Sequence, residues 1–148
     1  MKRILALILS IIMLSTCCLT ASASDTFGTA GDSASAITPR FTHITLVSAT
    51  IGERSLGFVL CASTYNCMLD DYTFTLTCTL QRTDGTTGWL NYKTETQTFT
   101  ELGTNGIEKT WFAPAGYAYR THTTIVVKNA RTSKVVETAT VSSPTIYK

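Results

Sequence analysis

The segment 72–82 constrains the fold most, because its side chains alternate strictly between apolar residues and threonine. A period of two residues places one set on each face of a β-strand. The apolar set is Phe74, Leu76, Cys78 and Leu80, and the polar set is Thr73, Thr75, Thr77 and Thr79. This pattern is typical of an antiparallel sheet with one buried face and one solvated face.

Further short segments of alternating or apolar residues lie between turn signals rich in Gly, Asn and Asp, and none has a helical period. The chain is therefore predicted to be all-β, an antiparallel Ig-like β-sandwich of about seven strands. Polar residues on both faces of 93–99 favour an edge strand there. The predicted strands are 42–51, 55–62, 72–82, 89–99, 107–113, 117–128 and 134–141.

The first 23 residues have the pattern of a secretory signal peptide. Lys2 and Arg3 precede an apolar stretch at 4–14, and Ala21-Ser22-Ala23 provides small residues for cleavage between Ala23 and Ser24. The stretch is too short for a membrane span. We expect a secreted, extracellular protein with no membrane span in its mature form.

One alternative would change the localisation. The segment 14–17 resembles a bacterial lipobox, in which Cys17 would be lipidated, although Thr16 stands where Gly, Ala or Ser is usual. Lipid anchoring at Cys17 therefore stays open beside cleavage at Ala23.

After the signal peptide, 24–36 is predicted to be a flexible leader, because it is rich in Ser, Gly, Ala and Thr and has no period. The sandwich domain is expected at 37–142, followed by a C-terminal tail at 143–148. Removing Lys2 and Arg3 leaves 12 − 2 = 10 basic residues against 10 acidic ones. A chain without net charge or blocks of like charge is a poor partner for nucleic acid.

Three cysteines follow the predicted cleavage site, and an odd number leaves at least one unpaired within a monomer. Cys67 is placed in a polar turn after the strand that holds Cys61, so a local Cys61–Cys67 disulfide is expected. Cys78 is then a small buried apolar residue. Three reduced thiols are the alternative.

No catalytic set, metal site or cofactor motif emerges. His43 and His122 lie on different predicted strands, and the adjacent pair Asp70-Asp71 lacks further oxygen ligands for calcium. Cys78 is expected in the core and His122 on the polar face, so the two should not meet as a nucleophile and its base.

Aromatic residues are the remaining candidates. Trp89 beside a glycine-rich turn, together with Tyr92, is the candidate ligand-binding pair, since aromatic faces can stack on sugar rings. Trp111 is expected in the core. Tyr117 or Tyr119 is expected to form a tyrosine corner, in which the hydroxyl bonds to upstream backbone.

Several motifs occur in an order that resembles a group of small secreted proteins of clostridia-like Gram-positive bacteria. The resemblance covers about 37–142 and implies an Ig-like or fibronectin-III-like fold without established function or catalytic residues. The motifs are ITPRFT at 37–42, LQR at 80–82, a turn into Trp89, GYAYR at 116–120 and KVVE at 134–137.

We therefore expect a non-catalytic, secreted binding or surface-interaction module with an unknown protein or glycan partner at a cell surface. The alternatives are a small secreted hydrolase and a toxin-like or self-assembling extracellular protein.

Overall fold

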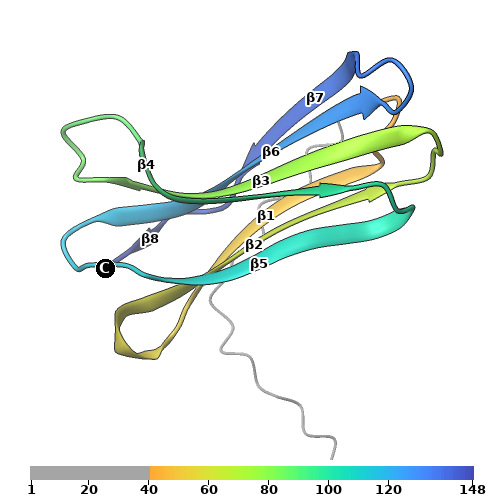
Figure 1. Ribbon diagram of the computed structural model, residues 1–148. Coiled ribbons are helices and arrows are strands. Elements are labelled where there is room, and N and C mark those ends of the chain that lie inside the picture. The colour runs from red at the N-terminus through yellow and green to blue at the C-terminus, as the bar shows by residue number, and fades with distance from the viewer. Residues whose placement is uncertain (1–40) are drawn as a thin grey trace, which may run out of the picture.

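The computed structural model describes residues 41–148, and these form two antiparallel sheets packed face to face (Figure 1). The predicted signal peptide, its cleavage site at Ala23, the lipobox cysteine Cys17 and the leader 24–36 lie outside the described residues. The strands, in chain order, are β1 (Leu46–Glu53), β2 (Phe58–Cys67), β3 (Tyr72–Thr83), β4 (Leu90–Phe99), β5 (Gly103–Phe112), β6 (Ala118–Asn129), β7 (Val135–Ser142) and β8 (Ile146–Tyr147), with a 3-10 turn at Ser55–Gly57.

The first sheet has the order β1-β2-β5, and the second has the order β4-β3-β6-β7 with β8 paired to β6. All pairs are antiparallel. The predicted all-β Ig-like sandwich is confirmed, with seven principal strands and the short eighth. Within residues 41–148 no helix has the length and hydropathy needed to cross a membrane.

The core lies between the inward faces of the two sheets. Phe74, Leu76, Cys78 and Leu80 of β3 are all fully buried, as their alternation predicts. Burying such side chains contributes about 1.5–3 kcal/mol for each large aliphatic or aromatic one. Trp111 of β5, which was expected in the core, packs against it and is only partly buried.

The tyrosine corner is formed by Tyr119 near the start of β6. Its hydroxyl donates a hydrogen bond of 2.7 Å to the main-chain oxygen of Pro114, and its ring is fully buried. Tyr117, the other candidate, is only partly buried. The corner fixes the connection between β5 and β6, which crosses from one sheet to the other.

The outer face of the larger sheet carries the predicted threonine row. Because β3 pairs with β6, Arg120 and His122 also lie on this face, opposite Gln81 and Thr79. Hydroxyl pairs between β3 and β4 bond to each other, for example Thr77 to Thr96 at 3.1 Å. Cross-strand contacts of this kind stabilise a solvated sheet face.

The C-terminal residues differ from the predicted tail. Ile146 and Tyr147 pair with Tyr119 and Ala118 of β6, and the Lys148 main chain bonds to Gly116 and Tyr117. The buried Ser143 helps to hold this return, because its hydroxyl accepts the Thr121 main-chain N–H at 2.9 Å. The segment 143–148 therefore belongs to the sandwich and closes one end of it.

Candidate functional site

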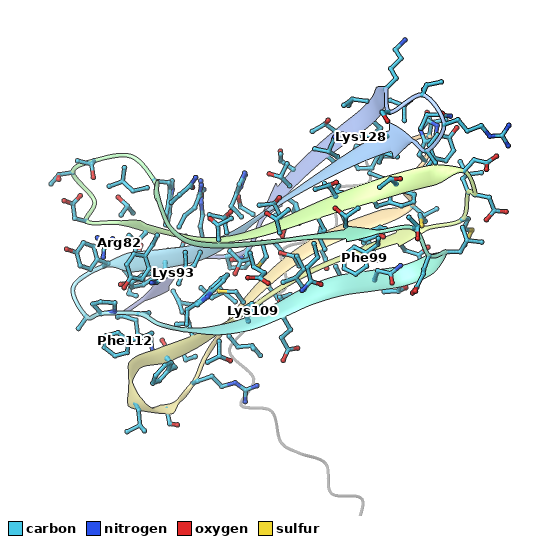
Figure 2. All side chains as sticks on the ribbon, viewed as in Figure 1. Arg82, Lys93, Phe99, Lys109, Phe112 and Lys128 are labelled. Carbon is cyan, nitrogen blue, oxygen red and sulfur yellow. The ribbon has the colours of Figure 1, made fainter. Side chains whose placement is uncertain are left out.

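One end of the sandwich brings together the β3–β4 loop, the β5–β6 loop and β8. Arg82 and Lys93 lie at this end in Figure 2, far from Lys128 at the other end. The β3–β4 loop is built around Asp84, whose Oδ1 accepts bonds from the main-chain N–H and the hydroxyl of both Thr86 and Thr87 at 2.9–3.1 Å. These four donors lower the pKa of the Asp84 carboxyl well below its usual range.

Trp89 follows this loop and stacks on Arg120 of β6, with the guanidinium carbon 4.2 Å from the ring centroid. Arg120 is itself held by a bond from its Nε to Gln81 Oε1 at 2.9 Å, and Gln81 bonds to Asn91 Oδ1 at 2.8 Å. The strand registers place Asn91, Gln81 and Arg120 in one row across β4, β3 and β6. This row positions the Arg120 guanidinium against the Trp89 ring.

Tyr92 is oriented by a β-bulge in β4. The register passes from Leu80↔Lys93 to Gln81↔Asn91, so Tyr92 has no partner on β3. A bulge redirects the side chain of the extra residue. As a result the Tyr92 ring lies on the core side, 6.4 Å from the ring of Tyr119.

Arg82 joins the aromatic residues of this end. Its guanidinium carbon lies 4.4 Å from the centroid of the Tyr92 ring and 4.7 Å from that of Tyr117. Burial raises the pKa of the Tyr119 hydroxyl, and the charge of Arg82 offsets part of this rise. None of the ion pairs formed within residues 41–148 includes Arg82 or Arg120.

An open cavity of about 270 Å³ lies among these elements. We call it the aromatic cavity, because rings from three separate segments line it: Trp89, Tyr117 and Tyr147. Gly85 and Gly116, both at positive φ, also line it and add no side chains to the cavity. Thr83, Asp84, Ala118, Thr145 and Lys148 line the remainder.

The structure thus brings the two predicted ligand-binding residues to the same end but gives them different positions. Trp89 lines the aromatic cavity, whereas Tyr92 lies behind it and contacts Arg82, which stacks on Tyr117. The sequence prediction missed Tyr147 and Lys148, because no local pattern indicated that the C-terminal residues return to the sheet.

Lys148 also ties the cavity to the β1–β2 hairpin. Its Nζ lies 3.3 Å from Glu53 Oε2, and its side chain is largely buried while that of Glu53 is more exposed. The hairpin is joined to the β5–β6 connection by the bond from Ala113 N–H to the Gly57 main-chain oxygen at 2.8 Å. These contacts join the β1–β2 hairpin, the β5–β6 connection and the C-terminal residues beside the cavity.

The predicted Cys61–Cys67 disulfide is wrong. β2 extends to Cys67, so both cysteines lie on one continuous strand rather than on a strand and a following turn. Six residues of strand span about 20 Å, whereas a disulfide needs Cα atoms within about 7 Å. The three cysteines after the predicted cleavage site are free and buried: Cys61, Cys67 and Cys78. The placement of Cys78 in the core is confirmed.

The core thiols do not have the environment of a nucleophile. Burial raises the pKa of Cys61 to about 12 and also raises that of Cys78. Thiolates act as nucleophiles, so such thiols are inert at neutral pH. As predicted, Cys78 and His122 do not meet, because they lie on opposite faces of the sheet.

The two histidines have other partners. His122 Nδ1 bonds to Ser142 Oγ at 2.8 Å on the open outer face of the sheet. Burial and the charge of Arg120 lower the pKa of His122. No carboxylate in the described part of the chain orients this histidine, as a serine nucleophile and its base would require. His43 instead pairs with Glu137 at 2.8 Å.

The described residues contain no cluster of three or more His, Cys, Asp or Glu side chains that would hold a metal ion. The chain matches no protein-family model, no curated protein and no solved structure. At the aromatic cavity, aromatic rings and an ionised carboxylate line a recessed surface, and Arg82 and Arg120 stack on two of these rings.

Proposed function

We propose that this protein is a secreted, non-catalytic binding module that attaches to a protein or glycan at a cell surface through the aromatic cavity. The observation that carries the proposal is the aromatic cavity itself, with Trp89, Tyr117 and Tyr147 contributed by three separate segments. Aromatic side chains supply a large contact area at low entropic cost, which is why they dominate binding sites.

The cavity is also preorganised, which favours binding. Trp89 is stacked on Arg120, and Tyr117 is stacked on Arg82. Rings held in place before the ligand arrives lose little rotamer freedom when it binds. A rigid sandwich that presents such rings suits recognition of a ligand at an extracellular surface, and the signal-peptide pattern at 1–23 agrees with secretion.

The test is the binding of the chain from Ser24 to Lys148 to intact and wall-stripped Gram-positive cells. We expect saturable binding to one of these surfaces that is lost in Trp89→Ala. The matched control is Met68→Ala, which truncates a well-exposed apolar side chain in the loop at the other end of β3.

Circular dichroism and thermal unfolding would verify that both variants are folded. Binding that is equal in Trp89→Ala and the parent chain would show that the aromatic cavity is not the site. Absence of binding to any of these surfaces would contradict the proposed function.

A further inference from the structure

We infer that the aromatic cavity takes a single uncharged sugar ring, such as a neutral hexose or N-acetylhexosamine unit of a polysaccharide. This inference rests on the proposed function and deepens it by naming the ligand class. It follows from the size of the cavity, from the charges around it and from the polar atoms that face it.

The size of the cavity limits the ligand to about one ring. A volume of about 270 Å³ lies just below the range of about 300–1,000 Å³ that holds drug-sized ligands. The cavity is open to solvent, so a ring inside it can remain linked to a longer chain outside. A terminal or side-chain sugar of a polysaccharide meets both conditions.

Cationic ligands are disfavoured, although aromatic cages often bind ammonium groups. The electron-rich face of Trp89 already contacts the Arg120 guanidinium at 4.2 Å, and that of Tyr117 contacts Arg82 at 4.7 Å. These two positive charges against the lining rings repel a further cation in the cavity. The two rings thus already have cation partners, and what they offer to a ligand is apolar surface.

Anionic ligands are disfavoured by Asp84, which lines the same cavity. The four donors of its turn favour the ionised carboxylate and lower its pKa, so the charge persists at any physiological pH. Lys148, the cation that lines the cavity, is paired with Glu53. A carboxylate placed beside Asp84 is therefore repelled. Charges of both signs lie around the cavity, Asp84 in its wall and Arg82 and Arg120 against its rings, so a charged ligand of either sign meets a like charge, whereas a neutral ligand does not.

A neutral sugar ring has an apolar face and polar edges, and the cavity offers partners for both. Its C–H face can stack on an aromatic ring, and its hydroxyl groups need acceptors and donors at the edge. All four bonds of the β3–β4 turn go to Asp84 Oδ1, which leaves Oδ2 as an acceptor for a ligand hydroxyl. The exposed Thr145 adds a hydroxyl on another lining segment.

Tyr147 offers the cleanest test, because its side chain is 80% exposed and its removal leaves the core intact. We expect Tyr147→Ala to weaken binding of a neutral oligosaccharide about tenfold, and Asp84→Asn to weaken it by a similar factor. Met68→Ala is the matched control with unchanged affinity. Affinity would be measured by titration calorimetry and by the change in tryptophan fluorescence that stacking on Trp89 produces.

The probes are three sets of soluble oligosaccharides: neutral ones, uronic-acid ones and de-N-acetylated cationic ones. Binding of a neutral set that weakens in Tyr147→Ala supports the inference. Preference for the acidic or the cationic set overturns it, and so does Trp89-dependent binding to cells with no binding to any neutral set. In that last case the proposed function stands. Absence of binding to every oligosaccharide and every cell surface overturns both.

Discussion

Thr121 and Thr123 are successive inward residues of β6, and we predict that removing their hydroxyl groups changes stability in opposite directions. Both side chains are fully buried. Thr121 Oγ1 has no hydrogen-bond partner, although it lies beside the Cys61 thiol. Thr123 Oγ1 bonds to Ser63 Oγ at 2.6 Å and to the Ser48 main-chain oxygen at 3.4 Å.

Valine has nearly the shape of threonine, so the substitution removes the hydroxyl without leaving a cavity. A buried polar group without a partner costs about 1–3 kcal/mol. Thr121→Val removes that cost, and we expect the free energy of unfolding to rise by about 1 kcal/mol. Thr123→Val breaks a buried bond and leaves the Ser63 hydroxyl with only the Cys78 thiol beside it, a weak partner, so we expect a fall of about 1–3 kcal/mol.

Urea unfolding of each variant measures the difference directly. With a slope of about 2 kcal/mol/M, the midpoint should rise by about 0.5 M for Thr121→Val and fall by about 0.5–1.5 M for Thr123→Val. A fall in both variants would show that the Cys61 thiol is an effective partner for Thr121. That result would contradict the prediction based on the unpaired hydroxyl.

Four further predictions concern the turns, the close strand contacts and the thiols. Leu56 is 87% exposed and has a left-handed backbone at φ 59°, so Leu56→Asn should raise the free energy of unfolding by about 0.5–1 kcal/mol in urea unfolding, whereas Leu56→Val should lower it. A Cβ at Gly106 would lie 2.8 Å from the Ser63 main-chain oxygen, so Gly106→Ala should lower the thermal midpoint, at a cost of about 1–3 kcal/mol; an unchanged midpoint would contradict the close approach. The pKa of Asp84 is lower in the folded state than its ordinary value of 3.8. The carboxylate therefore stabilises the fold above pH 3.8, and this stabilisation is lost as the pH falls below that value. Asp84→Asn should flatten the dependence of the free energy of unfolding on pH between about pH 5 and pH 2, and an unchanged dependence would contradict this prediction. The three core cysteines should all react slowly with a thiol reagent in the folded protein and quickly in denaturant, and fast labelling of any of them in the native state would contradict their burial.

Part of the site could be predicted from local pattern. Trp89 was a candidate because it follows a turn rich in glycine and polar residues, and turns place large side chains at the ends of a sandwich. Its partner Arg120 lies on the outer face, because it alternates with the buried residues of β6. The stacking of Trp89 on Arg120 needed the pairing of β3 with β6, which places Gln81 opposite Arg120.

Other features depended on contacts that the sequence does not encode locally. The bulge at Tyr92 is a shift in register between β3 and β4, and no residue in β4 indicates it when the sequence is read alone. The end of β2 was predicted too early, because the polar residues 63–66 resemble a turn when read alone. In the sandwich, Ser63 and Tyr65 are buried, and Ser63 bonds to Thr123 on the facing sheet.

The class of fold and the inward face of the principal strands could be derived from the amino-acid pattern alone. Side chains alternate with a period of two, and apolar residues must leave water, so the pattern assigns each face before any contact is known. The strand order, the register, the free state of the three core cysteines and the return of 143–148 to β6 became known only from the three-dimensional arrangement. These depend on which distant segments meet, and the aromatic cavity exists because three such segments end at the same place.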